Sequence, residues 1–493
     1  MENPLIQRPN ILFILADDMG HWALQCAGNT EIRTPNLDKL ASEGMRCENF
    51  FCASPVCSPA RASILTGRIP SQHGVLDYIR SGNVSKEKLD PSIQLLLPEE
   101  TTATEYLAGQ PAYTEILARA GYSCALSGKW HLGNSQVPQK GFGRWFTIAR
   151  GGCSYKTPDV VVDGNVQIKK GYVTDFITEQ ALIFLEELQE ERDRPFYLGV
   201  HYTAPHSPWE RSEHLEEQVS IYDDCPFTSV PELPPHANQI ETCPHGEGER
   251  RKELLRGYYA AVTAMDNGIG RLLQMLDQVG LRDDTLVIFM SDNGMNMGHH
   301  GIWGKGNATF PLNLFDTSVK IPAIFRHPGV IPRGKVIHDL LSQYDIFPTI
   351  LDYVMLQNPT QSDLPGTSFV TLLKGEKCWG RKELVVYDEY GPVRMIRTAV
   401  WKYVHRYPYG PHELFNLEHD PEEEVNLIDK QHFAHVRDDL RRRLGVWYAK
   451  YVSAEFDGVY AGVSGFGQTG LAVPGKRESS FVALDEKAGE FLK

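Results

Sequence analysis

The chain has 493 residues, of which 42% are hydrophobic and 23% are charged, and this composition is typical of a globular protein. Its formal net charge of −14 argues against nucleic-acid binding, and no segment has the uninterrupted apolar length that spans a bilayer. An anionic substrate would therefore need a local cluster of positive side chains. A chain of this length predicts two domains of unequal size.

The nine cysteines include no C-x-x-C pair, which argues against a zinc site and against a complete disulfide framework. This cysteine usage is typical of a reducing compartment. Residues 1–9 lack the basic start and the long apolar stretch of a secretory signal. We therefore expect a cytoplasmic protein, or one whose leader has been removed.

The first predicted strand ends in two acidic residues. Residues 10–16 form a continuous apolar run, which predicts a strand buried on both faces of a parallel sheet. Asp17 and Asp18 follow it directly. Adjacent carboxylates at the end of a strand suit a hard cation, although a solvated acidic turn is the commoner structure for such a pair.

The sequence Cys-Ser-Pro-Ala-Arg at residues 57–61 opens a short predicted helix, which Gly67 ends. This helix places Cys57 at its N-terminus, where free N–H groups and the helix dipole favour negative charge. Arg61 lies one turn further on and can bind the same anion through its planar guanidinium. The alternative for this short pattern alone is a buried free thiol beside a surface arginine.

Two further predicted strands, at residues 122–127 and 195–202, are followed by basic residues. Lys129 and His131 lie between glycines after the first of them, where a solvent-exposed loop is the alternative. Residues 150–156 form a glycine-broken loop whose basic side chains could contact a substrate, although a plain surface turn is the simpler structure. His206 lies between prolines, and a structural and a catalytic role for it remain open.

Residues 210–250 predict a long loop typical of a lid or a specificity insert, and a long helix follows at 253–279. A fourth strand at 285–290 leads to Asp292 and Asn293. Lys305 lies in a flexible turn before a fifth strand at 319–325. Alternating strands and helices over this length predict an α/β fold with a large, mostly parallel sheet flanked by helices.

The pattern changes near residue 375. Short strands at 383–388, 393–398 and 402–406 predict an antiparallel sheet, which a basic amphipathic helix at 432–451 would cover. The glycine-rich tail from Ala461 is expected to wrap over the larger domain. We therefore predict a catalytic α/β domain at residues 1–375 and a smaller C-terminal domain at residues 376–493.

In open α/β sheets, ligands bind at the carboxyl ends of the strands. The carboxylate and amide oxygens there predict a site for calcium or magnesium, formed by Asp17, Asp18, Asp292 and Asn293. Cationic and imidazole side chains are expected around it: Arg61, Lys129, His131, His206 and Lys305. A metal held by anionic ligands and ringed by cations predicts a site for a tetrahedral oxyanion ester.

Together these motifs resemble those of type I sulfatases of the alkaline phosphatase superfamily, from about residue 10 to about residue 451. The resemblance is carried by residues 57–61 with Thr66 and Gly67, by Gly-Lys-Trp-His-Leu-Gly at 128–133, by the paired aspartates at 17 and 18, and by Ser-Asp-Asn-Gly at 291–294. It implies that a sulfatase-maturing enzyme converts Cys57 to formylglycine, which is hydrated to a geminal diol. One diol oxygen would attack sulfur, the alcohol would leave with a proton, and collapse to the aldehyde would expel sulfate, a step that a thiol cannot perform.

The resemblance also implies the role of each site residue. Calcium, or magnesium in its place, would be bound by Asp17, Asp18, Cys57 in its modified form, Asp292 and Asn293. Arg61 would orient the diol and stabilise the part of the site that binds the metal. Lys129 and Lys305 would stabilise charge on the sulfate, and His131 would assist ionisation or collapse of the diol. His206 would protonate the leaving oxygen.

The sequence departs from the family pattern at two places. Ala60 stands where serine is common, and the residues after Lys305 differ from the family's usual segment. The segments at 150–153 and 303–307 are similar to those of bacterial carbohydrate sulfatases and imply a small sulfated saccharide as substrate. A glycosaminoglycan-derived oligosaccharide with a 2-O-sulfated uronate or a 6-O-sulfated hexosamine would fit.

Two other functions remain open from the sequence. The first is a phosphonate or phosphate ester hydrolase of the same superfamily, some members of which use the same modified residue. The second is an unmodified protein that binds an anion without catalysis, because a sequence does not show whether Cys57 is converted.

Overall fold

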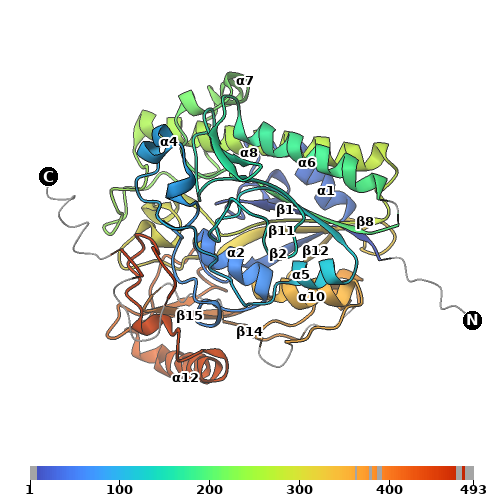
Figure 1. Ribbon diagram of the computed structural model, residues 1–493. Coiled ribbons are helices and arrows are strands. Elements are labelled where there is room, and N and C mark those ends of the chain that lie inside the picture. The colour runs from blue at the N-terminus through green and yellow to red at the C-terminus, as the bar shows by residue number, and fades with distance from the viewer. Residues whose placement is uncertain are drawn as a thin grey trace, which may run out of the picture.

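The computed structural model describes residues 8–191, 193–360, 364–376, 380–385, 391–472 and 480–482. A large central sheet has helices on both faces, and a smaller unit with its own sheet lies below it in Figure 1. The strand order in the large sheet is β12-β2-β11-β8-β1-β7-β3-β4-β5-β6, and β13 pairs with β2. This architecture is the predicted α/β fold with a mostly parallel sheet.

Parallel strands form the centre of the large sheet: β1 (Asn10–Ala16), β3 (Ser123–Gly128), β4 (Arg144–Ile148), β7 (Phe196–His201) and β8 (Thr285–Ser291). Next to β8, β11 (Lys320–Arg326) runs antiparallel to both of its neighbours. The remaining strands lie at the two edges: β2 (Met45–Phe51), β5 (Asp159–Val162), β6 (Asn165–Ile168), β12 (Lys335–Ile337) and β13 (Leu341–Ser342).

All five strands predicted for this domain are present, as β1, β3, β7, β8 and β11. The edge strands and the central strand β4 were not predicted, because most of them are short or interrupted by polar residues. In β2, for example, Arg46 and Glu48 are half-buried and form an ion pair at 2.6 Å between buried neighbours. Such a strand has the polar pattern of a connection when it is read without its partners.

Two layers of helices cover the sheet, as Figure 1 shows. One face carries α1 (Pro35–Glu43), α6 (Val173–Glu190) and α8 (Gly248–Gln278), and the other carries α2 (Cys57–Thr66), α5 (Tyr113–Arg119) and α10 (Ile346–Tyr353). Shorter elements connect them: α3 (Pro70–His73), α4 (Pro91–Leu96), α7 (Glu216–Val219), α9 (Asp316–Val319), α11 (Val370–Leu373), β9 (Asn296–Met297) and β10 (Trp303–Gly304).

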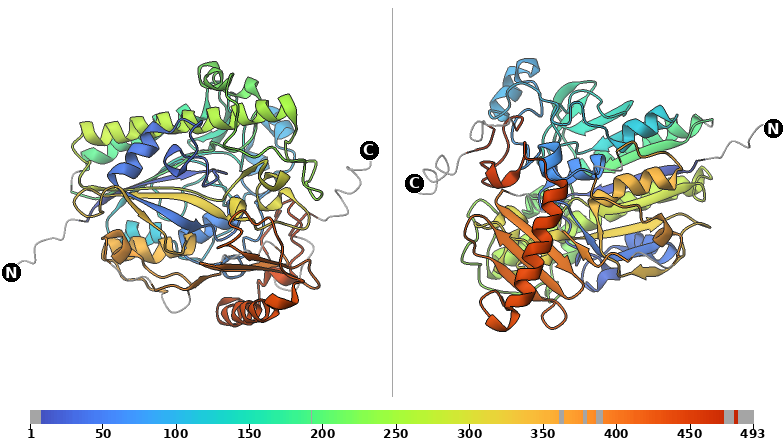
Figure 2. Two further views of the ribbon diagram at one scale, coloured as in Figure 1. Left: turned by 180° about the vertical axis from the view of Figure 1, so that it is seen from behind. Right: turned by 90° about the horizontal axis from the view of Figure 1, so that it is seen from below.

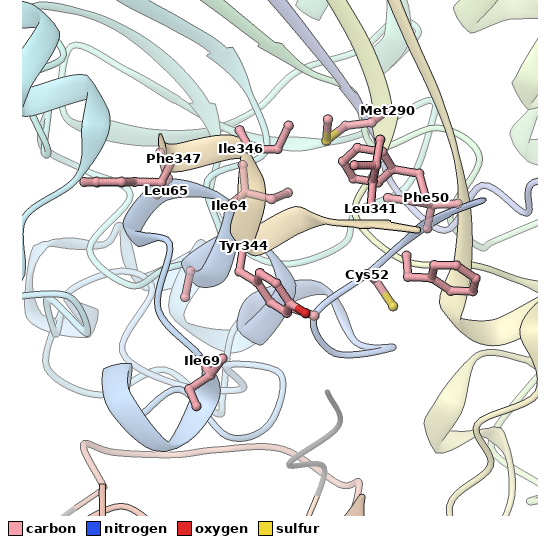
Figure 3. Close-up of a cluster of buried hydrophobic side chains, with 14 of the residues drawn as sticks. Phe50, Cys52, Ile64, Leu65, Ile69, Met290, Leu341, Tyr344, Ile346 and Phe347 are labelled. Carbon is pink, nitrogen blue, oxygen red and sulfur yellow. The ribbon is translucent and has the colours of Figure 1, made fainter. Parts of the chain in front are cut away.

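Alternate residues of β1 point into two different cores. Phe13 packs with α2, α5 and α10, whereas Ile14 packs with α1, α6 and α8. In the first core, Ile64 of α2 lies beside Ile346 of α10 (Figure 3). Because all ten residues of α2 are buried, its position relative to the sheet is set by packing on every side.

The C-terminal unit has a four-stranded antiparallel sheet, β14 (Glu383–Leu384), β15 (Val393–Thr398), β16 (Trp401–Arg406) and β17 (Glu413–Asn416). Helix α12 (Ala434–Tyr451) crosses this sheet, as the right view of Figure 2 shows and as the sequence predicts. Of the strand predicted at 383–388, residues 386–388 lie outside the described residues. The boundary between residues 375 and 376 stays a prediction.

Polar contacts join the C-terminal part of the chain to the large sheet domain. Lys402 of β16 is fully buried and lies 3.0 Å from a carboxylate oxygen of Asp316 and 2.5 Å from one of Glu423. The tail returns as expected: Gln468 accepts a backbone hydrogen bond from Arg80 and donates one to Tyr78, both at 2.8 Å. The tail therefore covers part of the α/β domain.

No helix in the described ranges is long and apolar enough to cross a membrane. The cysteines in those ranges are all free thiols, and Cys378 lies outside them.

Candidate active site

The ten predicted site residues come together at the carboxyl end of the parallel sheet. The neighbouring strands β1 and β8 bring Asp17, Asp18 and Asp292 together, with one oxygen of each within 4.8 Å of the others. All three side chains are buried. The next residue, Asn293, donates to Asp18 through its amide nitrogen at 2.8 Å.

The donor set fits a divalent cation. Oδ1 of Asp17 and Oδ1 of Asn293 are buried and accept no hydrogen bond from the described residues. Buried oxygens without donors are costly, and a hard cation with several oxygen ligands would satisfy them. Burial raises the pKa of Asp17 to about 8, against the opposing effect of Lys129. A cation bound at these oxygens would favour the ionised carboxylate.

Helix α2 presents Cys57 and Arg61 to this cluster. The helix begins at Cys57 itself and ends before Gly67, whose φ of 66° closes it in a left-handed cap. Arg61 donates through Nε to Asp292 at 2.9 Å and through Nη1 to the carbonyl oxygen of Lys129 at 3.0 Å. The Arg61 guanidinium thus fixes the Asp292 carboxylate relative to the backbone at Lys129.

Two lysines donate hydrogen bonds to the aspartates of the site. Nζ of Lys129 donates to Asp17 at 2.6 Å, and Nζ of Lys305 donates to Asp18 at 2.5 Å. The second contact shows that Lys305 reaches the cluster although the residues after it depart from the family pattern. Burial acts to raise the pKa of Asp18, but Lys305 and His206 outweigh it and the pKa is lowered.

Both site histidines are held by backbone carbonyl groups. Nδ1 of His206 lies 2.7 Å from the carbonyl oxygen of Ser207, and its Nε2 lies 3.7 Å from a carboxylate oxygen of Asp18. Nε2 of His131 lies 2.9 Å from the carbonyl oxygen of Ile79. A ring nitrogen beside a carbonyl oxygen carries the proton, so Nε2 of His206 and Nδ1 of His131 are the nitrogens left to act on other groups.

A positioning residue was missing from the sequence analysis. The side chain of Gln343 accepts from the backbone of Ala53 at 2.9 Å and donates to the carbonyl oxygens of Ser291 and Asp292 at 3.0 and 2.6 Å. It joins the segment before α2 to the end of β8. A single buried glutamine gives no sequence signal for this role, because its partners are backbone atoms far away in the chain.

An open pocket of about 370 Å³ lies above Cys57, Asp18 and Lys305. Four residues of the 210–250 segment line it, as expected for a specificity insert: Ile240, Thr242, Cys243 and Pro244. Arg150 also lines it, whereas Lys156 is exposed elsewhere. Asn307 of the segment 303–307 also lines the pocket. Other residues of the wall were not predicted to lie there, among them Tyr78, Arg80, Asn83, Glu99, Gly465 and Phe466.

Comparison with known proteins decides the family. A family model described as Sulfatase matches residues 9–355, which is most of the chain. The chain belongs to the sulfatase family. A second model, described as N-sulphoglucosamine sulphohydrolase, C-terminal, matches residues 298–450. The protein is thus a sulfatase of the alkaline phosphatase superfamily, as its motifs predict, and a sulfuric ester hydrolase.

Relatives of this sulfatase include enzymes named for sulfated sugars. It is 27% identical to N-acetylglucosamine-6-O-sulfatase of Bacteroides thetaiotaomicron, over 89% of this chain and 86% of the relative. It is 30% identical to N-acetylgalactosamine-6-sulfatase of Mus musculus, over 75% of this chain and 67% of the relative. A structure in complex with its substrate D-glucosamine-2-N,6-O-disulfate is similar with a TM-score of 0.73 and 25% identity, over 91% of this chain and 99% of that one.

Proposed function

We propose that this sulfatase removes sulfate from a small sulfated saccharide through a formylglycine made from Cys57 by a maturation enzyme. The observation that carries the proposal is the position of Cys57 in the first turn of α2, facing a pocket whose floor it shares with Asp18 and Lys305. The relatives named above, which are named for sulfated sugars, support a sulfated saccharide as the substrate. Hydrated formylglycine supplies the oxygen nucleophile and, by collapsing to the aldehyde, the route for releasing sulfate.

The environment of Cys57 argues that its unmodified thiol is inert. Burial raises the pKa of the thiol, and this effect outweighs the opposing charges of Lys129 and Lys305. A thiol in this position stays protonated near neutral pH, and the thiolate is the nucleophilic form of cysteine. This supports conversion of Cys57 to another group before this position attacks an ester.

For the metal we propose calcium, held by Asp17, Asp18, Asp292, Asn293 and the modified residue 57. An oxygen-only site formed by several protein side chains favours calcium, because magnesium usually keeps several waters. A bound cation would supply charge stabilisation for the sulfate oxygens. Arg61 holds Asp292 in place through its hydrogen bond at 2.9 Å.

The side chains that face the pocket would divide the remaining work. Lys129 and Lys305 bring positive charge to the position where sulfate oxygens gain negative charge, which lowers the barrier most in a site that excludes water. His131 would take a proton from the diol. His206 would give a proton to the leaving oxygen through Nε2, the ring nitrogen that is not bound to Ser207, when both of its ring nitrogens are protonated. Burial lowers the pKa of His206 to about 4, and the nearby Asp18 carboxylate opposes this effect by favouring the protonated ring.

Replacing His206 with alanine should reduce kcat on a sugar sulfate by about 10²- to 10⁴-fold, the range of general acid catalysis. The loss on 4-nitrophenyl sulfate should be only a few-fold, because nitrophenolate leaves without a proton. Steady-state kinetics on the two esters measure the difference. The exposed His432 provides a control, since His432→Ala should change neither rate. Equal losses on the two esters would contradict the role of His206.

Replacing Gly151 with alanine should lower kcat/KM by about 10- to 100-fold, because a small displacement of a catalytic group has effects of this size. A Cβ at Gly151 would lie 2.2 Å from Cε1 and Nε2 of His131, so the imidazole must move. The matched control is Gly143→Ala, whose Cβ meets only the carbonyl oxygen of Cys124 at 3.9 Å. Full activity of Gly151→Ala would show that catalysis does not need His131 where it lies.

The substrate class is tested with a panel of esters and purified, matured enzyme. The panel contains 4-nitrophenyl sulfate, 4-nitrophenyl phosphate, N-acetylglucosamine-6-sulfate and a 2-O-sulfated uronate. We expect sulfate to be released from at least one sugar ester and the aryl sulfate to be cleaved faster than the aryl phosphate. A preference for the phosphate, or no release from any sugar, would overturn the proposal.

A further inference from the structure

A second hollow adjoins the active-site pocket. It has a volume of about 270 Å³ and is lined in part by residues 96–100. Three residues line both spaces, Arg80, Glu99 and Arg150. A ligand bound over Cys57 can therefore extend past these three side chains into the second hollow.

The guanidinium group of Arg150 is held in place on one side, and its terminal nitrogens can still donate hydrogen bonds to a ligand. Its Nε donates to Oδ2 of Asp159 at 2.8 Å, and the Asp159 side chain is buried at the start of β5. Within the described part of the chain, its two terminal nitrogens have no hydrogen-bond partner. A guanidinium held on one side presents its remaining N–H groups as a fork, the geometry that suits a carboxylate or a sulfate.

Arg150 also lies close to the reacting groups. The next residue, Gly151, packs directly against the ring of His131, and a Cβ at Gly152 would meet Cε1 of His206 at 3.3 Å. Consecutive Cα atoms are about 3.8 Å apart, and Arg150 is one residue from Gly151 and two from Gly152. The Cα atom of Arg150 is therefore separated from the two histidines by a distance that a single sugar ring can span. Beside it, Arg80 donates to Glu99, and such a pair offers donors and acceptors suited to sugar hydroxyl groups.

We infer that Arg150 binds a second anionic group, a carboxylate or a sulfate, on the saccharide that carries the scissile ester. The inference rests on the proposed function and narrows it from sulfated sugars to sugars with two negative charges. Because the overall charge is −14, a second anionic group depends on a local cation for its binding. Asp159 acts as a positioning residue that sets the direction in which the terminal N–H groups of Arg150 point.

The test compares Arg150→Gln with the wild-type enzyme on N-acetylglucosamine-6-sulfate, on D-glucosamine-2-N,6-O-disulfate and on a 2-O-sulfated uronate. The first ester has one anionic group, the second adds a sulfate and the third adds a carboxylate. For whichever dianionic ester the wild-type enzyme prefers, KM should rise by about 10- to 100-fold with a smaller change in kcat. The rise for the monosulfate should be much smaller, and the two dianionic esters show which anion is bound.

Two further variants separate binding from structure. Arg150→Lys keeps a cation beside Asp159 but loses the fork, so it should fold with an unchanged Tm and still show a raised KM on the dianionic ester. Lys156→Gln, on the same loop but exposed, should behave as wild type on all three esters. Wild-type KM in Arg150→Lys together with a low Tm in Arg150→Gln would reduce Arg150 to a structural partner of Asp159 and overturn the inference.

The outcomes also distinguish this inference from the function on which it rests. If Arg150→Gln changes KM equally on the monosulfate and the dianionic esters, the second anionic subsite is wrong and the saccharide function stands. If the wild-type enzyme cleaves 4-nitrophenyl sulfate but none of the three sugars, the saccharide function itself fails and the subsite falls with it.

Discussion

Cys57→Ala should abolish sulfate-ester hydrolysis, with a loss in kcat of at least about 10⁵-fold, the effect of deleting a covalent nucleophile. The fold should remain, because the change removes only one buried sulfur atom from a helix that is packed on every side. Alanine is also the best helix former, so α2 should keep its position. Activity on 4-nitrophenyl sulfate, with a thermal melt of each protein, measures both expectations.

Peptide mass spectrometry completes this experiment. In wild-type protein made with a sulfatase-maturing enzyme, the tryptic peptide of residues 47–61 should carry an aldehyde at residue 57, and activity should rise with the aldehyde fraction. Cys52→Ala, at a buried cysteine in the segment before α2, should keep both the aldehyde and the activity. Appreciable turnover by Cys57→Ala would sink the formylglycine mechanism, and an unmodified but active Cys57 would do the same.

Asp292→Ala should damage both stability and activity. Arg61 is only 2% exposed, and Nε and Nη2 both lie 2.9 Å from Oδ2 of Asp292. Removing the carboxylate leaves a buried, poorly compensated charge, which costs about 3–5 kcal/mol in free energy of unfolding. The same change removes a proposed metal ligand, so kcat should fall by at least about 10³-fold.

The metal provides an independent readout of Asp292. A ligand that binds only the native state raises Tm by mass action, so calcium added to chelated wild-type protein should raise its Tm. The same addition should not stabilise Asp292→Ala. Asp277→Asn, which weakens a surface ion pair with Arg282, should respond to calcium as wild type does. A calcium-dependent Tm in Asp292→Ala would contradict the proposed ligand set, and a response to magnesium alone would reassign the metal.

The residues on the floor of the site could be predicted from the sequence because regular structure positions them. Asp17 and Asp292 follow apolar runs that become neighbouring parallel strands, and the ends of such strands must meet. Cys57 and Arg61 lie one turn apart on a helix, so their proximity follows from helix geometry.

The outer wall of the pocket could not be predicted for the opposite reason. Arg80 and Glu99 belong to a polar connection without periodicity, and their place beside the pocket depends on long-range contacts. One of these contacts comes from Gln468, far away in the sequence. A pattern in the local sequence contains no information about such a partner, and only the folded structure reveals it.

The contact between Gln468 and residues 78–80 also has a consequence for how the protein matures. Synthesis proceeds from the N-terminus, and domains generally begin to fold in that order. Every predicted catalytic and metal-binding residue precedes Gly306, whereas Gly465 and Phe466 of the pocket wall are translated long afterwards. Once Gln343 and α10 have also been made, the nascent chain can assemble its catalytic centre while the substrate pocket is still open on one side. The groups that cleave the ester come first during biosynthesis, and the wall that selects the substrate is completed last.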